Sequence, residues 1–342
     1  MSIVNRKKAT YSHVRANEHL VFFRTSAWLS ENGEAWHVPI HAWIYKPQQS
    51  YARKHAFLTL LKKKYGLVAS DKNSKSIDDR VNLLLADNKR GRRVVITLGD
   101  TEYLLPKSKK NGHIEAVLTL PVASVTARPH MLRFNAKMQD GDTRVFSGES
   151  LLISPVGRSV ISDIDDTVKV SQVTETKALL NNTFFNDFSP VAGMSTLYQQ
   201  LHQLGFQFHF VSSSPWHLYF PLCEFLEKYN FPWATLRLKK IRLKDKTLFN
   251  LFKKGTKTKP IVIEHILNHY PQHSFFLVGD SGEQDARVYA DIAAKYPRQI
   301  EKIFIRDIAG SMIDNESYDI IFKDIPKEKW QIFLMGNDIK IT

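Results

Sequence analysis

The chain up to about residue 155 consists of short segments rich in apolar, β-branched and aromatic residues. Turn signals such as Asn32-Gly33 and Asn111-Gly112 separate them. Asparagine and glycine readily adopt the positive φ that tight hairpin turns require. We therefore expect strands at 20–23, 27–29, 36–45, 93–98, 102–105, 113–120, 131–138 and 143–153. Several short strands joined by such turns favour a mainly antiparallel sandwich or barrel.

A helical pattern interrupts these strands between residues 51 and 87. Apolar residues recur there at the spacing of one helix face, and a polar stretch at 70–76 divides the pattern in two. The repeating residues are Phe57, Leu58, Leu60, Leu61, Tyr65, Ile77, Val81, Leu84 and Leu85. A β-rich, sandwich-like first domain is therefore expected at 1–155, with a helical insertion near 51–87.

Strands and helices alternate after Pro155-Val156-Gly157. Strands are expected at 159–164, 206–211, 234–238, 274–278 and 302–305, and helices at 194–204, 216–229, 261–270 and 283–294. Such alternation indicates an α/β domain, expected at 156–342, in which helices cover both faces of a parallel sheet. These sheets bind ligands at the carboxyl ends of their strands, so polar residues at strand ends are the candidates for chemistry.

Composition indicates a globular protein with more than one domain. The chain has 342 residues, 43% of them hydrophobic and 24% charged. Cys223 is the only cysteine, which excludes an internal disulfide framework and agrees with a reducing compartment. Neither a signal peptide nor a run of 18 uncharged apolar residues is present. We therefore expect a cytoplasmic protein that either stays in solution or associates peripherally with a membrane.

The formal net charge of +14 indicates a polyanionic partner, either a phosphorylated substrate, an anionic membrane or nucleic acid. The excess of positive charge is concentrated at 237–259, a stretch with ten basic residues and one acid, Asp245. This stretch could contact an anionic membrane surface. A solvated basic face without a ligand is the alternative. Nucleic acid is the least favoured partner, because no known recognition motif accompanies the charge.

Three carboxylates follow the apolar segment at 159–162 within four positions: Asp163, Asp165 and Asp166. Carboxylates this close repel one another unless a cation or a proton neutralises them. Side chains two apart on a strand point to the same side, so Asp163 and Asp165 would face one site while Ile164 faces the core. The spacing suits a nucleophile with an acid/base partner. Taken alone, the motif fits an acidic loop at a strand end equally well.

The other strand ends carry complementary groups. Ser212, Ser213 and Ser214 precede Pro215 at a helix start, where hydroxyl and N–H groups can bind phosphate, although helix capping by Ser214 would also explain the pattern. The segment 279–285 contributes Asp280 and Asp285, oxygen donors of the kind that Mg²⁺ prefers. Lys257 and Lys259 lie ahead of the helix between these two strands, where a lysine could reach the site.

The order of acid pair, hydroxyl, lysine and second acid pair resembles the haloacid dehalogenase-like phosphatase superfamily. A closer resemblance is carried by the segments Ser212-Ser213-Ser214-Pro215-Trp216, 278–285 and 303–307. These are similar to the family typified by the fungal actin-patch-associated phosphatidate phosphatase, with lipins as more distant mechanistic relatives. The resemblance covers residues 158–310 and implies a Rossmann-like catalytic domain of the haloacid dehalogenase type.

The resemblance also implies roles for individual residues. Asp163 would be the nucleophile that forms an aspartyl-phosphate, and Asp165 the acid and then the base. Mg²⁺ would be held by the Asp163 carboxylate, the Asp165 backbone carbonyl and Asp280, with Asp285 a direct or water-mediated ligand. The residues that would hold the substrate phosphate are Ser212, Ser213 and one lysine, for which Lys259 fits better than Lys257.

Between the first motif and the next helix lies an insertion at 168–193, expected to be a small cap. Its polar and aromatic residues, which include Asn181, Asn182, Phe184, Phe185 and Phe188, could frame a diacylglycerol-like group or simply cover the site. The sequence thus predicts a Mg²⁺-dependent phosphatase acting on phosphatidate or a related lipid phosphate. The alternatives are a phosphatase for a soluble phosphomonoester, and a non-catalytic protein that binds anionic membrane or nucleic acid.

Overall fold

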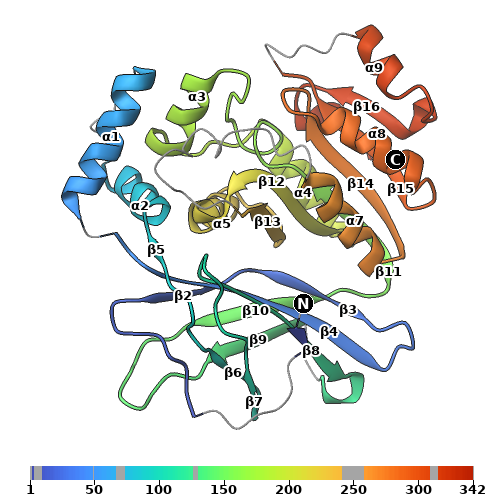
Figure 1. Ribbon diagram of the computed structural model, residues 1–342. Helices are drawn as coiled ribbons and strands as arrows, with labels where there is room; N and C mark the ends of the chain where they lie inside the picture. Colours follow the sequence, from blue (N-terminus) through green and yellow to red (C-terminus); the bar gives the residue numbers. More distant parts are fainter. Residues whose placement is uncertain are drawn as a thin grey trace. The chain divides into compact units, whose positions relative to one another are not determined.

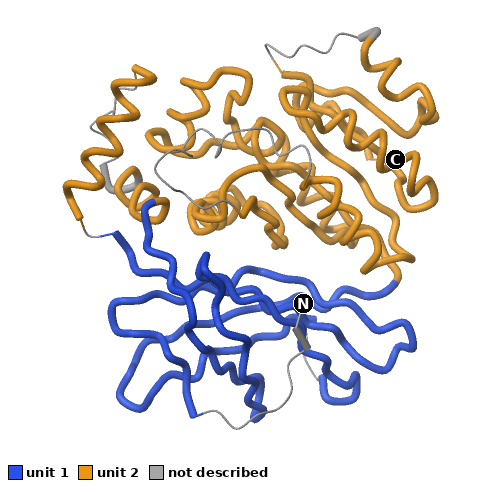
Figure 2. The backbone as a smooth tube through the Cα atoms, viewed as in Figure 1, with its two compact units in different colours: residues 1–49, 85–155 blue, residues 50–84, 156–342 orange. Residues whose placement is uncertain are grey.

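The computed structural model describes residues 2–3, 10–48, 50–66, 74–125, 130–240, 258–308 and 315–341. Contacts along the chain divide the protein into two compact units, which Figure 2 shows in different colours. Unit 1 comprises residues 1–49 and 85–155, and unit 2 comprises residues 50–84 and 156–342. Each unit has its own sheet.

Unit 1 is built on a ten-stranded sheet whose main path runs β1-β8-β4-β3-β10-β9-β6-β7, with β2 and β5 also paired to β4. All pairs are antiparallel except β1 with β8 and β10 with β3. Its strands are β1 Ser2–Ile3, β2 His19–Phe22, β3 Thr25–Leu29, β4 Ala35–Lys46, β5 Asp87–Asn88, β6 Val95–Leu98, β7 Thr101–Leu104, β8 His113–Pro121, β9 Met131–Ala136 and β10 Ser147–Leu152.

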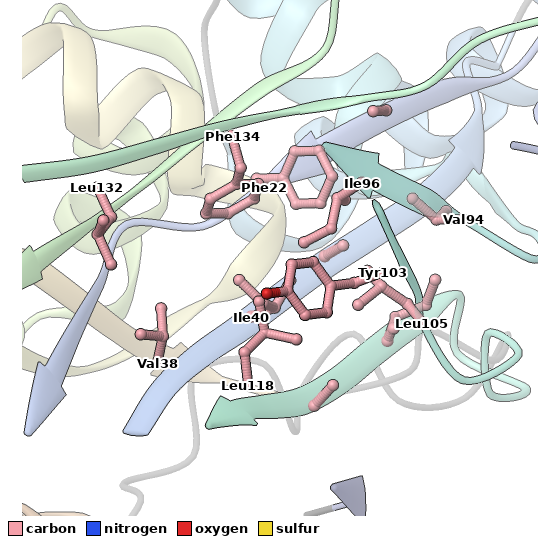
Figure 3. Packing of buried hydrophobic residues seen from close by; sticks show 14 of the residues in the cluster. Phe22, Val38, Ile40, Val94, Ile96, Tyr103, Leu105, Leu118, Leu132 and Phe134 are labelled. Carbon is pink, nitrogen blue, oxygen red and sulfur yellow. The ribbon is translucent and has the colours of Figure 1, made fainter. Parts of the chain in front are cut away.

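Buried apolar side chains from several strands of unit 1 pack together in one cluster, as Figure 3 shows. Phe22 on β2 and Phe134 on β9 meet edge to face with ring centroids 5.0 Å apart. Ile40 on β4 and Ile96 on β6 are fully buried in the same cluster. Alternation along the strands explains this arrangement, because residues two apart point to one face. The mainly antiparallel β structure expected for the first domain is confirmed.

Unit 2 contains a six-stranded parallel sheet with the order β13-β12-β11-β14-β15-β16. The strands are β11 Val156–Ser162, β12 Gln207–Pro215, β13 Thr235–Lys239, β14 Gln272–Asp280, β15 Ile300–Arg306 and β16 Trp330–Phe333. The helices are α1 Tyr51–Tyr65, α2 Ser74–Leu84, α3 Thr176–Leu180, α4 Met194–Gln203, α5 Tyr219–Lys228, α7 Lys259–His269, α8 Asp285–Lys295 and α9 Asn315–Ile321. Short helical turns are η3 Asn181–Phe185, η4 Trp216–Leu218 and η6 Gly336–Asp338.

The strand order of unit 2 reverses direction after β13, because the chain returns past β11 to form β14. Crossovers between parallel strands are right-handed, so α4 and α5 cover one face of the sheet and α7 and α8 the other (Figure 1). The reversal falls between β11 and β14, and sheets of this kind bind ligands at the carboxyl ends of the strands on either side of such a point. The α/β class with a parallel sheet, expected from the alternating elements, is confirmed.

The helical pair α1 and α2 packs with unit 2, although the sequence suggested an insertion belonging to the first domain. Phe57 on α1 meets Phe184 edge to face at 6.2 Å, and Arg80 on α2 donates hydrogen bonds to the carbonyls of Thr183 and Asn186. These partners lie more than 100 residues further along the chain, so local periodicity could not indicate them. No helix among the described residues is long and apolar enough to cross a bilayer.

Candidate active site

The carboxyl ends of the two central strands bring Asp163 and Asp280 together. Ser162, the last residue of β11, pairs with Val278 of β14, and the N–H of Asp163 donates to the Val278 carbonyl at 2.9 Å. Asp280 is the last residue of β14, and Asp285 is the first residue of α8. The Asp163 and Asp280 side chains therefore meet at the point where the strand order reverses.

Three buried carboxylates form one group at this position. Ligand atoms of Asp163, Asp280 and Asp285 all lie within 4.8 Å of one another. Neither side-chain oxygen of Asp163 accepts a hydrogen bond from a described residue, although Lys259 Nζ lies 3.0 Å from Oδ1, and Oδ2 of Asp280 accepts none either. Burial and the neighbouring negative charges, only partly offset by Lys259, raise the pKa of Asp163 and of Asp280 well above the ordinary value.

This group fits a hard divalent cation. Buried polar atoms without partners are rare, and here three of them are carboxylate oxygens that converge on one position. An all-oxygen donor set of this kind suits Mg²⁺, and its charge would remove the repulsion among Asp163, Asp280 and Asp285. The side chain of Asp165 is not part of the group.

Lys259 is the basic residue that reaches the carboxylates. As the first residue of α7, it is buried, and its Nζ lies 3.0 Å from Asp163 Oδ1, 3.6 Å from Glu283 Oε2 and in contact with Asp285 Oδ1. Burial alone would lower the pKa of Lys259, but these acids raise it well above the ordinary value. The sequence left Lys257 as an alternative, and that residue lies outside the described part of the chain.

Asp165 has an environment opposite to that of Asp163. Its Oδ1 contacts Lys169 Nζ at 2.9 Å and accepts a hydrogen bond from Ser171 Oγ at 2.7 Å. Its Oδ2 accepts hydrogen bonds from Ser214 Oγ at 2.6 Å and Ser212 Oγ at 3.2 Å. Burial alone would raise the pKa of Asp165, but the ammonium group and the hydroxyls lower it to about 2. The carboxylate is therefore held ionised.

The serine segment at the end of β12 faces the acid/base candidate. Ser212 and Ser214 both bond Asp165, and Ser213 Oγ donates to Glu283 Oε2 at 3.3 Å. The sequence allowed Ser214 to be a helix cap, but η4 begins after Pro215 without a side-chain cap. Ser214 is therefore not a helix cap, and its hydroxyl points into the site.

The turn after β11 is fixed by Asp166. Its carboxylate accepts the N–H groups of Ser171, Gln172 and Val173 at 2.7, 2.8 and 2.6 Å. Asp166 itself has φ 56°, a left-handed conformation that aspartate tolerates better than most residues. Three hydrogen bonds compensate for this strain, so the carboxylate of Asp166 shapes the loop and is not directed at the cation group.

Gly279 allows the second acid pair to close on the site. A Cβ at this position would lie 2.4 Å from Asp285 Oδ2, which is closer than real Cβ atoms come to other atoms. The absence of a side chain therefore lets α8 begin directly against the end of β14. Asp280 Oδ1 then accepts the N–H groups of Gly282 and Glu283 at 2.6 and 3.1 Å, which leaves Oδ2 directed at the cation group.

The aromatic residues of the insertion at 168–193 form its core. Phe184, Phe185 and Phe188 are 0%, 2% and 6% exposed. Phe188 packs edge to face on Phe225 at 6.0 Å, and the Arg80 guanidinium lies over its ring at 3.9 Å. These rings hold the insertion to α2 and α5. Their burial argues against the role of framing an acyl chain.

The basic stretch 237–259 is only partly described, because residues 241–257 lie outside the described part of the chain. Its last member, Lys259, is buried in the site and cannot contact a membrane surface.

Lys169 and Ser171 are site residues that sequence reasoning missed. Lys169 stands four residues after Asp165, a spacing that suggests a pair on a helix, but nothing else in the sequence shows that this loop turns back.

Comparison with known proteins shows similarity to one class of catalytic domain. Residues 158–307 match the family described as "Phosphatidate phosphatase APP1, catalytic domain". This match contains every site residue discussed above, from Asp163 to Asp285. The resemblance inferred from the sequence motifs is confirmed.

Two curated proteins are similar to about half of this chain. The protein is 34% identical over 171 residues to "Phosphatidate phosphatase APP1" of Saccharomyces cerevisiae, which is 49% of this chain and 29% of the yeast protein. It is 31% identical over 173 residues to an uncharacterized protein of Schizosaccharomyces pombe, which is 50% of this chain and 28% of that protein. The similarity thus covers less than a third of either relative. Among solved structures, a phosphoserine phosphatase in apo form aligns with 44% of this chain and 86% of its own, at 12% identity and a TM-score of 0.27.

Proposed function

We propose that this protein is a Mg²⁺-dependent phosphatase that hydrolyses phosphatidate or a related lipid phosphate to a diacylglycerol and inorganic phosphate. One observation carries the proposal: two buried carboxylates two residues apart have opposite surroundings. Asp163 has oxygens without hydrogen-bond partners beside a group that fits a cation, whereas Asp165 is bonded by an ammonium group and three hydroxyls. A nucleophile and an acid/base group need this difference.

The reaction has two steps. A carboxylate oxygen of Asp163 attacks phosphorus, the bond from phosphorus to the ester oxygen breaks, and Asp165 gives a proton to the leaving alkoxide. Water then attacks the phosphorus of the aspartyl-phosphate, Asp165 takes a proton from this water, and the Asp163 carboxylate leaves. Asp163, Asp280 and the Asp165 backbone carbonyl, with Asp285 directly or through water, would hold Mg²⁺, which would lower the repulsion between the nucleophile and the phosphate dianion.

The phosphoryl oxygens would be bound by Ser212, Ser213 and Lys259. Without substrate the pKa of Asp165 is about 2 despite its burial, chiefly because of Lys169 and the hydroxyl of Ser214. A phosphate dianion bound beside Asp165 would add negative charge next to its carboxylate and so favour the protonated form that the first step requires.

The lipid substrate is supported by the similarity of residues 158–307 to a phosphatidate phosphatase catalytic domain. A soluble phosphomonoester is the second candidate. It is favoured by the burial of Phe184, Phe185 and Phe188, which leaves these rings unable to contact an acyl chain. The two substrates require the same chemistry at Asp163 and differ only in the leaving group.

Phosphate release from phosphatidate in mixed micelles, with Mg²⁺ or EDTA, tests the proposal. We expect Mg²⁺-dependent release that falls at least about a thousandfold in Asp163→Asn, which keeps the shape of the side chain but removes the nucleophile. Asp291→Asn, the same change at an exposed acid on α8, is the matched control and keeps full activity. Turnover of an aryl phosphate without turnover of phosphatidate would favour the soluble substrate. Phosphate release from neither substrate would favour a non-catalytic protein that binds anionic membrane or nucleic acid.

A further inference from the structure

Two neighbouring apolar side chains are exposed in the turn after β16. Leu334 is 60% and Met335 50% exposed. Their turn is well fixed, because Asp338 Oδ2 accepts the N–H groups of Leu334 and Met335 at 3.0 and 2.8 Å, and Gly336 donates its N–H to the Ala192 carbonyl at 2.9 Å. The exposure is therefore a property of an ordered turn.

This turn lies at the rim of the proposed active site. The Arg306 guanidinium donates from Nε to the Leu334 carbonyl at 2.9 Å and from Nη1 to the Asp166 carbonyl at 2.7 Å. One side chain thus spans the distance from the exposed turn to the loop that carries Asp163 and Asp165. Because β16 runs parallel to β15, its end lies at the same edge of the sheet as the site.

The same edge of unit 2 carries exposed positive charge. The last turn of α1 contains Lys62, Lys63 and Lys64, all exposed, and this helix has no acidic residue. Its end lies beside α3, since a Cβ at Gly66 would be 3.8 Å from Lys177 Nζ. Figure 1 shows the end of α1 on the side of unit 2 to which the strands of the parallel sheet point.

We propose that this edge of unit 2 docks on an anionic lipid bilayer, with Leu334 and Met335 entering the interfacial region and the three lysines of α1 facing the headgroups. The proposal rests on the proposed function, because a phosphatase for a lipid phosphate must meet its substrate at a membrane surface. It assigns the contact to residues outside the basic stretch 237–259. Paired apolar and basic groups at one edge fit a bilayer because it offers an apolar layer beneath an anionic surface.

The contribution expected from each of these side chains to membrane binding is large enough to measure. Each lysine near an anionic surface strengthens binding by about fivefold. Transfer of the exposed part of a leucine side chain into an apolar region strengthens it by about tenfold. Loss of the three lysines should therefore weaken binding more than loss of Leu334 alone.

The test uses the full-length protein and vesicles of phosphatidylcholine with or without phosphatidylserine, with binding measured by flotation. The variants are Leu334→Ser and the triple change Lys62→Gln, Lys63→Gln and Lys64→Gln. The control for the first is Leu204→Ser, which removes a leucine that is 57% exposed at the opposite edge of the same sheet. The control for the triple change has the same net charge and removes three exposed bases at that opposite edge: Lys228→Gln, Lys295→Gln and Arg298→Gln.

We expect the lysine triple variant to bind phosphatidylserine vesicles about a hundredfold more weakly and Leu334→Ser about tenfold more weakly, with both controls at wild-type affinity. Turnover of a soluble aryl phosphate should be unchanged in all four, which shows that each is folded and active. Equal losses in the controls would mean that diffuse charge or general exposure drives binding and would overturn the proposal, as would wild-type binding by both test variants. If the wild type binds vesicles through these residues but does not hydrolyse short-chain phosphatidate, the proposed function fails and the docking surface stands.

Discussion

Both units of the protein bury carboxylates, and Glu18 in unit 1 and Asp163 in unit 2 have opposite surroundings. Glu18 in unit 1 is 2% exposed and accepts hydrogen bonds from Arg92 Nε at 2.8 Å and from the Arg15 N–H at 3.1 Å. Burial alone would raise the pKa of Glu18, but these partners lower it. Asp163 in unit 2 is 0% exposed, has oxygens without hydrogen-bond partners among the described residues, and has a raised pKa.

The difference separates a structural charge from a functional one. A buried charge costs stability unless partners compensate for it, so an arrangement such as that of Glu18 is expected wherever a carboxylate serves the fold. The three carboxylates of Asp163, Asp280 and Asp285 have only one described cation in contact with them, Lys259, so the compensation is incomplete at the place where a parallel sheet binds its ligands. We interpret the missing partners as positions for a cation and a phosphate.

The change with the largest expected effect tests the different roles of Asp163 and Asp165 within the site. Asp165→Asn removes the acid/base group and should lower turnover by about a hundredfold to ten-thousandfold. With an aryl phosphate, whose leaving group needs little protonation, the second step should suffer more than the first. Phosphorylated Asp163 should then accumulate, which mass spectrometry of acid-quenched protein would detect.

The control for this experiment is the double change Asp163→Asn with Asp165→Asn, which should form no phosphorylated protein. Wild-type turnover in Asp165→Asn, or a phosphate attached to another residue, would contradict the assigned roles.

Lys259→Gln tests the only described cation that contacts the carboxylate group. Breaking a buried ion pair typically costs about 3–5 kcal/mol, so we expect the free energy of unfolding in EDTA to fall by about that amount. Chemical denaturation measures the change. Lys295→Gln, which breaks the exposed pair with Glu264 at 2.7 Å, is the control and should leave the midpoint unchanged. Equal effects of both changes would argue against a tightly coupled site.

Glu18→Gln tests the compensated carboxylate of unit 1 and should lower the free energy of unfolding by less than Lys259→Gln does. Loss of charge-assisted hydrogen bonds at a buried position costs about 1–3 kcal/mol at neutral pH. Because the pKa of Glu18 is lowered in the folded protein, its contribution is present above the unfolded pKa and is lost as the pH falls. Denaturation of both proteins at neutral and acid pH should therefore show a difference that shrinks in acid. A difference independent of pH would contradict the assignment.

Much of the site could be predicted because its residues stand at strand ends. The positions of Asp163, Ser212, Asp280 and Asp285 follow from the alternation of strands and helices, and Lys259 follows from its place at the start of α7. Local patterns suffice here, since parallel strands deliver their carboxyl ends to one edge.

The remaining parts depend on contacts that no local pattern encodes. Lys169 reaches Asp165 only because the loop folds back, with an isolated bridge between these two residues. Phe184 is buried by α1, whose Phe57 lies far away in the sequence. The strand β16 was missed because it is only four residues long and follows a short helical turn at 327–329.

Thermal unfolding of the wild type and Asp163→Asn, in EDTA and in Mg²⁺ at neutral pH, tests the central claim most directly. A carboxylate whose pKa is raised in the folded protein lowers stability as the pH rises above its unfolded pKa. We therefore predict that Asp163→Asn is at least as stable as the wild type in EDTA, and that Mg²⁺ raises the midpoint of the wild type more than that of the variant. A less stable variant in EDTA, together with no effect of Mg²⁺ on the wild type, would contradict the account.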